Sequence, residues 1–134
     1  MESQDRIIMK LPCKPEYVSV ARLTVSGVAN RIGFDIETVE DIKVAVSEVC
    51  SRIISVAGTS EKDYEIWFDI SAQKLTIRFN SDIERINCIF DDDEDGLGVA
   101  IINAFMDEVE YCPKGKSYIL SMTKNFEVIS CNEI

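Results

Sequence analysis

The spacing of apolar residues changes once along this chain, from a repeat near 3.6 residues to a repeat of 2. Between Glu16 and Gly58 the apolar residues stand three or four positions apart, which predicts helices. From Ile66 to Phe79 they alternate with polar residues, which predicts strands with one buried face. Helices followed by amphipathic strands are typical of a fold in which helices pack on one face of an antiparallel sheet.

The helical part divides into two helices, expected over residues 16–32 and 38–56. Pro15 suits the first turn of the first helix and Gly33 its exit. The second helix is expected to begin at Thr38, where the sequence resembles a capping box. Its apolar stripe should be buried and should leave Glu48 outside it. The stripe consists of Val39, Ile42, Val46, Val49 and Ile53.

The remaining elements complete the order β-α-α-β-β-α-β-β. Residues 5–11 are expected to form an edge strand, and the two alternating runs a hairpin that turns around Ala72 and Gln73. A polar, irregular stretch follows at residues 80–95. A third helix is expected over 97–106, and then a second hairpin of residues 108–112 and 117–124, with its turn at 113–116. The predicted fold is a single α+β domain over residues 1–134, a two-layer sandwich with a mostly antiparallel sheet.

Composition excludes several classes of function. The chain has 134 residues, 46% of them hydrophobic, which suffices for one sizeable core. With 14 Lys and Arg against 24 Asp and Glu, the net charge is −10, which argues against nucleic acid and anionic membranes as partners and suits a basic protein. There is no histidine, which excludes Ser-His-Asp catalysis, histidine-ligated haem and the usual zinc sites.

The five cysteines indicate a reducing compartment. They form no CxxC pair, no secretory signal precedes them, and no apolar run is long enough to span a membrane. We therefore expect a cytoplasmic protein whose cysteines are mostly small core residues.

Glu48 and Arg52, four residues apart on the second predicted helix, are the first candidate site. A carboxylate that faces a pocket can act as a general base towards a hydroxyl group or water. An ordinary ion pair along the helix is the alternative, since residues four apart lie on the same face.

A second candidate is the sequence Gly96-Leu97-Gly98, directly before the third helix. Glycines there let the backbone approach a phosphate, and the helix N-terminus offers N–H donors. The alternative is a purely conformational need for glycine at a junction between a loop and a helix.

The acidic run of residues 91–95 is the third candidate. With Gly96 it matches the first half of a calcium-binding loop. Ile102 occupies the position of the glutamate that completes such a loop, so a solvated acidic loop is the simpler interpretation.

Four segments of the chain together resemble a known family. These are residues 15–24 (PEYVSVARLT), 40–50 (EDIKVAVSEVC), 95–98 (DGLG) and 106–109 (MDEV). They are similar to the anti-sigma-factor serine kinases, which belong to the GHKL, or Bergerat-fold, ATPases. The resemblance extends from about residue 7 to residue 126, and the branch that holds the general-stress sigma factor is the most similar.

The resemblance assigns roles to particular positions. Glu48 matches the glutamate that activates the substrate serine. Arg52 stands where the family has an asparagine that holds Mg²⁺, and a guanidinium group has no acceptor with which to ligate a metal. In the expected register, Asn80 replaces the aspartate that reads the adenine, and Asp82 replaces the glycine two residues on. The resemblance assigns phosphate binding to Gly96, Leu97 and Gly98.

The resemblance thus implies a cytoplasmic anti-sigma regulator that binds a sigma factor or an anti-sigma antagonist. Its partner surface is expected near Arg22, Asn30 and Arg31 of the first helix. No cofactor or metal is expected, with ATP and Mg²⁺ required only if the family activity survives, and a homodimer is left open. The alternatives are an active serine kinase of the same family and an acidic domain that senses a metal or a metabolite.

Overall fold

The computed structural model describes residues 4–58, 62–81, 89–91 and 95–126. Three helices and five strands follow one another in the predicted order, with a short 3₁₀ turn before the first helix. The elements are β1 (Asp5–Pro12), η1 (Pro15–Tyr17), α1 (Val18–Ile32), α2 (Ile36–Ala57), β2 (Asp63–Ile70), β3 (Lys74–Ser81), α3 (Leu97–Phe105), β4 (Glu108–Tyr111) and β5 (Leu120–Asn125).

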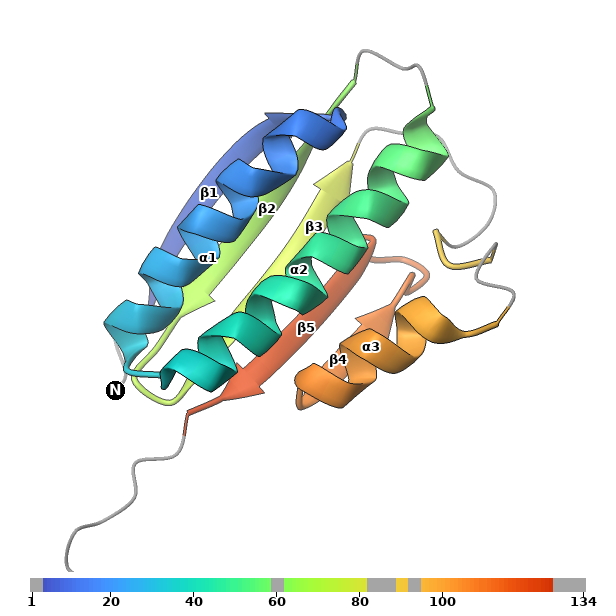
Figure 1. The fold of residues 1–134 in the computed structure, drawn as a ribbon. Helices are drawn as coiled ribbons and strands as arrows, with labels where there is room; N and C mark the ends of the chain where they lie inside the picture. Colours follow the sequence, from blue (N-terminus) through green and yellow to red (C-terminus); the bar gives the residue numbers. More distant parts are fainter. Residues whose placement is uncertain (1–3, 59–61, 82–88, 92–94, 127–134) are drawn as a thin grey trace, which may run out of the picture.

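The five strands form one sheet in the order β1-β2-β3-β5-β4, and every neighbouring pair is antiparallel. All three helices lie on one face of this sheet, with α1 and α2 side by side and α3 next to α2 (Figure 1). The predicted α+β two-layer architecture is therefore confirmed, and β1 is an edge strand as expected.

The core lies between the two layers. Ile66 and Phe68 of β2 and Ile77 and Phe79 of β3 point to the helices and are fully buried, because alternate residues of a strand share a face. The predicted stripe of α2 meets them from above, which confirms that prediction. Its members Val39, Ile42, Val46, Val49 and Ile53 are all buried.

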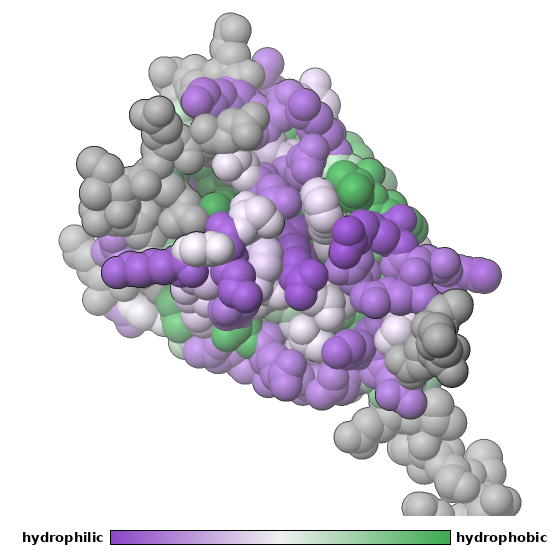
Figure 2. All heavy atoms as spheres, turned by 180° about the vertical axis from the view of Figure 1, so that it is seen from behind, coloured by the Kyte–Doolittle hydropathy of each residue, from purple (hydrophilic) through white to green (hydrophobic). Residues whose placement is uncertain are grey.

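The opposite face of the sheet has no helix over it in the described part of the chain, and hydrophilic side chains cover most of it (Figure 2). Its centre is Asp69, whose side chain is only 3% exposed because two arginines flank it. Arg6 of β1 lies 2.6 Å from Asp69, and Arg78 of β3 lies 3.4 Å from it. These ion pairs tie three neighbouring strands together.

The helix starts differ from the predictions. Helix α2 begins at Ile36, and its N-cap is Asp35, whose side chain accepts a hydrogen bond of 2.8 Å from the backbone N–H of Thr38. Thr38 is thus the donor of the cap and not the capping residue, because the helix already begins two residues before it. Pro15 starts a 3₁₀ turn, and the α-helical geometry of α1 begins only at Val18.

The end of the second hairpin also differs. Strand β5 begins at Leu120, whereas the sequence pattern placed the start of the strand at residue 117. Ile119 still donates a hydrogen bond of 2.8 Å to the carbonyl of Phe79 and accepts one of 2.9 Å from the N–H of Cys112. The pairing therefore reaches back one residue before the regular strand, and residues 117–118 belong to the turn.

The cysteines follow the prediction in part. Cys13 and Cys50 are free and buried, as expected of small core residues. Burial raises the pKa of Cys50 to about 11, and burial and the nearby Asp63 raise the pKa of Cys13. Cys112 departs from the prediction, because it is disulfide-bonded.

Within the residues that the structure describes, none of the helices combines the length and the apolar character needed to cross a membrane.

Candidate functional site

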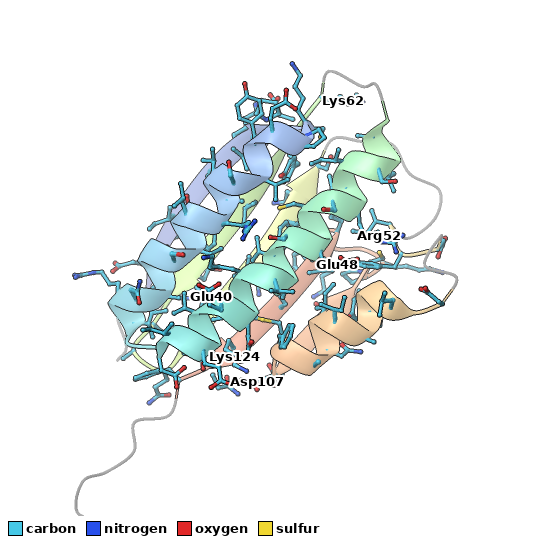
Figure 3. All side chains as sticks on the ribbon, in the orientation of Figure 1. Glu40, Glu48, Arg52, Lys62, Asp107 and Lys124 are labelled. Atoms are coloured by element: carbon cyan, nitrogen blue, oxygen red, sulfur yellow. The ribbon has the colours of Figure 1, made fainter. Side chains whose placement is uncertain are left out.

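Helix α2 directs Glu48 and Arg52 towards the start of α3 (Figure 3). Arg52 Nε lies 3.7 Å from Glu48 Oε1, and the two side chains are 23% and 27% exposed. Residues four apart on a helix are neighbours on its surface, which explains the pair. The ion-pair alternative is thus present in the structure, but at the junction of two helices and not on a solvated face.

Gly98, in the first turn of α3, meets this pair directly. A Cβ atom on Gly98 would stand 2.6 Å from Glu48 Oε1 and 3.5 Å from an Arg52 guanidinium nitrogen. The first distance is too short for any real Cβ contact. Glycine at this position therefore allows the Glu48 carboxylate to approach the backbone of α3.

Phe90 closes the same site from the segment before α3. Its ring lies 5.6 Å from the Arg52 guanidinium carbon and 3.4 Å from the position of a Gly98 Cβ. It also packs edge-on against Tyr111, with 5.5 Å between the ring centroids. Tyr111 in turn donates a hydrogen bond of 2.8 Å to the side chain of Asn103 on α3. Phe90 is buried, so this aromatic pair seals the junction.

The start of α3 is held by the chain itself. Gly96 is the N-cap, with a φ of 69° that favours glycine. The Asp95 carboxylate accepts a hydrogen bond of 3.1 Å from the backbone N–H of Leu97, while the Leu97 side chain is 59% exposed. A helix N-terminus offers its N–H groups to anions, and here two carboxylates, of Asp95 and Glu48, lie beside it.

Asn80 does not join this site. It alternates with Phe79 along β3, so its side chain lies on the face of the sheet away from the helices, opposite Glu65 of β2. There its Oδ1 atom is buried without a hydrogen-bond partner among the described residues, at a small pocket of about 110 Å³ that Lys10 also lines.

Ser81 is the residue of this segment that shares the helix side of the sheet. It follows Phe79 by two positions and pairs with the buried Tyr64 of β2. The register that makes Asn80 the adenine-reading residue stays a prediction; in the structure Asn80 lies on the opposite face of the sheet from the helices. Successive residues of a strand point to opposite faces of the sheet. The alternation of apolar residues along β3 therefore predicts that Ser81, and not Asn80, lies on the helix side.

Two predicted groups fall outside the described residues. Asp82 is one, and residues 92–94, the centre of the acidic run, are the other. In the part of the chain that the structure describes, no cluster of three Asp, Glu, Cys or His side chains is placed to hold a metal ion.

Two features of the described residues oppose the binding of ATP with Mg²⁺. The space that a glycine leaves next to a helix N-terminus is taken by the carboxylate of Glu48, which repels phosphate. Arg52 offers donors only and cannot ligate Mg²⁺. These residues hold the Glu48 carboxylate against the N-terminus of α3. The carboxylate can accept a proton from a hydroxyl group only after it is released from Arg52.

Sequence reasoning missed Phe90. It lies in a stretch that was classed as polar and irregular, yet Ile89 and Phe90 are adjacent apolar residues there, and both are buried. A pair of apolar residues inside a polar loop is the signal that could have identified a segment packed against the core.

Comparisons with known proteins agree with this fold. Residues 11–124 match the family model of the histidine kinase-like ATPase domain. The chain therefore belongs to the anti-sigma-factor serine kinase family of these ATPase domains.

Individual relatives are similar over most of their length. A protein of Listeria monocytogenes named serine-protein kinase RsbW is 37% identical over an alignment of 146 positions. This alignment covers 96% of this chain and 93% of the relative. A protein of the same name from Oceanobacillus iheyensis is 39% identical, covering 82% and 80% of the two chains. One from Bacillus cereus is 36% identical, covering 82% and 79%.

Proposed function

We propose that this chain is an anti-sigma regulator that acts by binding a protein partner, a sigma factor or an anti-sigma antagonist, while its ATP binding and kinase activity are weak or lost. The single observation that carries the proposal is the contact of Glu48 with Gly98. The residue in the position of the catalytic base is turned to Arg52 and fills the space beside the helix N-terminus that a phosphate would need.

Three features support weak nucleotide binding. Arg52 replaces the amide that would anchor Mg²⁺. Phe90 and Tyr111 seal the junction in front of α3. Asn80, which the resemblance places where the family has a charged aspartate, is uncharged. The names of the relatives describe serine-protein kinases, so the competing function is an active serine kinase that uses the same site. Glu48 is the residue that favours this function.

The partner surface is proposed on α1, near Arg22, Asn30 and Arg31. All three are exposed. In a chain of net charge −10, α1 carries two arginines and no acidic residue, so it is a locally basic element that can attract a partner of opposite charge.

Purified partners test the proposal. A general-stress sigma factor and its anti-sigma antagonist are each titrated onto the immobilised chain with and without ATP and Mg²⁺. We expect binding of one of them, unchanged by nucleotide, and no phosphate transfer to a serine as measured by intact mass. Phosphate transfer would establish the active kinase instead, and binding of neither partner would contradict the proposal.

Charge reversals locate the surface. Arg22→Glu and Arg31→Glu should each weaken capture about tenfold without lowering Tm, because surface charges at an interface act on association more than on folding. Lys116→Glu, which lies in the exposed turn before β5, is the matched control and should bind like the wild type. If Tm falls in step with binding, the surface assignment is wrong.

A further inference from the structure

A row of polar side chains crosses the open face of the sheet near the start of β2. Lys10 of β1 lies directly opposite Glu65 of β2, and Glu65 lies directly opposite Asn80 of β3. Neighbouring strands are about 4.8 Å apart, so three side chains in one row can contact the same small molecule. Hydrophilic side chains cover most of this face (Figure 2). Because Glu48 lies on the other side of the sheet, the row is separate from the candidate site described above.

A small pocket lies at this row. It has a volume of about 110 Å³ and is lined by Lys10, Asp63, Tyr64, Glu65, Asn80 and Ser81. The side chains of Lys10 and Asp63 are 65% and 43% exposed, so solvent reaches the pocket. A water molecule takes about 30 Å³ of liquid, so the pocket has room for several waters or for a small organic molecule. Its lining combines one positive and two negative side chains.

The side-chain oxygen of Asn80 indicates that the pocket receives a hydrogen-bond donor. Asn80 Oδ1 is buried, and it has no hydrogen-bond partner among the described residues. A buried acceptor without a partner is destabilising, and folded proteins retain few of them. Because the pocket lies beside this atom, a donor group inside the pocket can complete its hydrogen bonding.

Two carboxylates next to Asn80 add further acceptors. Glu65 Oε1 accepts a hydrogen bond of 2.9 Å from the indole N–H of Trp67. Asp63 Oδ2 lies 3.9 Å from Lys10 Nζ, at the outer limit of an ion pair. Each carboxylate can accept several hydrogen bonds through its two oxygens. An organic ammonium group, with three N–H donors and a positive charge, matches this set of acceptors.

Lys10 decides between a metal ion, a simple amine and a zwitterion. Its positive charge belongs to the same small lining, and repulsion between like charges opposes a divalent cation there. A simple amine would meet the same repulsion. A ligand that also carries a carboxylate turns the charge of Lys10 into an attraction. An α-amino acid carries an ammonium group and a carboxylate on one carbon atom.

We propose that this pocket binds a small zwitterionic α-amino acid, such as alanine, whose ammonium group donates hydrogen bonds to Asn80 Oδ1 and Glu65 and whose carboxylate is held by Lys10. The volume of the pocket admits a side chain of only a few atoms. The proposal goes beyond the proposed function and does not depend on it, because the pocket and the candidate site lie on opposite faces of the sheet.

Trp67 makes the proposal measurable. It is the single tryptophan of the chain, and its indole N–H donates to Glu65 in the pocket lining. L-Alanine is titrated into the ¹⁵N-labelled chain at constant salt concentration. We expect the indole signal and the side-chain amide signals of Asn80 to shift with a Kd of about 1 mM, in keeping with a ligand of so few atoms. Ethylamine lacks the carboxylate and propionate lacks the ammonium group, and each should bind at least about fivefold more weakly.

The other results of these titrations overturn the proposal. Ethylamine that binds as tightly as alanine would mean that the pocket does not recognise a carboxylate. Calcium chloride that shifts the same signals at lower concentrations than alanine would identify a cation site. No shift with alanine at concentrations well above 1 mM, about 50 mM, would mean that the pocket holds only water.

Two variants test the two ends of the ligand. Asn80→Val removes the buried acceptor and should weaken alanine at least about tenfold without lowering Tm, because a β-branched residue suits a strand. Lys10→Met keeps the apolar stem of the side chain and removes its charge. It should weaken alanine at least about fivefold and should not weaken ethylamine, which has no carboxylate.

Asn125→Val and Lys74→Met, at exposed positions of the same sheet, are the matched controls and should bind alanine like the wild type. If Asn80→Val binds alanine like the wild type, the acceptor has no role and the proposal is wrong. If Lys10→Met weakens alanine and ethylamine equally, Lys10 does not hold the carboxylate, which also contradicts the proposal.

Discussion

The Glu48 carboxylate and Gly98 are in contact across two helices: Oε1 lies 2.6 Å from the point at which a Cβ on Gly98 would stand. Gly98, which the resemblance predicts to bind phosphate, and Glu48, which it predicts to act as the base, thus meet each other here. This contact joins two residues 50 positions apart and connects the chemistry of α2 with the start of α3.

The contact predicts a coupling between the two positions. Gly98→Ala should lower the free energy of unfolding by about 1 kcal/mol, because the new methyl group displaces the Glu48 carboxylate. In a Glu48→Ala background the same change should be neutral or stabilise by up to about 1 kcal/mol through helix propensity. Urea unfolding of the four proteins of the cycle gives the coupling, for which we expect about 1–2 kcal/mol. Additive effects would mean that the carboxylate does not occupy this space.

Nucleotide binding should be weak and should respond to two changes together. By calorimetry the wild type should bind ATP with Mg²⁺ more weakly than about 100 μM, roughly −5.5 kcal/mol. Arg52→Asn alone restores a metal-ligating amide and should improve binding only slightly, because Phe90 still seals the junction. Arg52→Asn with Phe90→Ala should improve it by about tenfold or more.

The control for this series is Phe105→Ala, which removes an aromatic ring from the other end of α3 and should leave nucleotide binding unchanged. Wild-type binding tighter than about 100 μM would refute weak ATP binding. A double variant that binds no better than the wild type would mean that Phe90 and Arg52 do not obstruct the nucleotide.

The cap of α2 should give a pH-dependent contribution to stability. The hydrogen bond from the Thr38 N–H lowers the pKa of Asp35 in the folded state. A lowered folded pKa gives stability that is present above the unfolded pKa, near 3.8, and is lost as pH falls through the folded value. Asp35→Ala should therefore lower Tm at pH 7, and thermal melts should show a smaller difference from wild type below about pH 3.5. Asp35→Asn keeps an acceptor and should lose less; a difference independent of pH would contradict the role of the charge.

The buried thiols should be inert in the folded protein. Cys50 is fully buried with a pKa of about 11, and Cys13 is buried with a raised pKa, so almost no thiolate is present at pH 8. Mass spectrometry after treatment with iodoacetamide should find both unmodified until denaturant is added. Because the folded pKa of Cys50 is raised, its contribution to stability is complete below about pH 9, the unfolded value, and is lost as pH rises towards 11. Rapid native labelling of Cys50 would contradict its burial.

The sequence predicted most helices and strands because the spacing of apolar residues that identifies each one lies within that segment. The apolar stripe of α2 from Val39 to Ile53 and the alternation from Ile66 to Phe79 each specify a buried face within one segment, and both are found as expected. The helix starts were less well determined. Asp35 and Thr38 are both good capping residues by type, and only the backbone of the turn after Gly33 decides which of them caps the helix.

What the sequence determined by itself is thus the set of helices and strands, the residues of the core and the candidate pair of Glu48 with Arg52, all of which depend on spacings within one turn or one strand. Only the tertiary structure decided that β5 lies between β3 and β4, and that Gly98 and Phe90 close around Glu48. These relationships join segments far apart in the chain. They depend on how the helices pack on the sheet, and the spacing of apolar residues within one segment does not predict that packing.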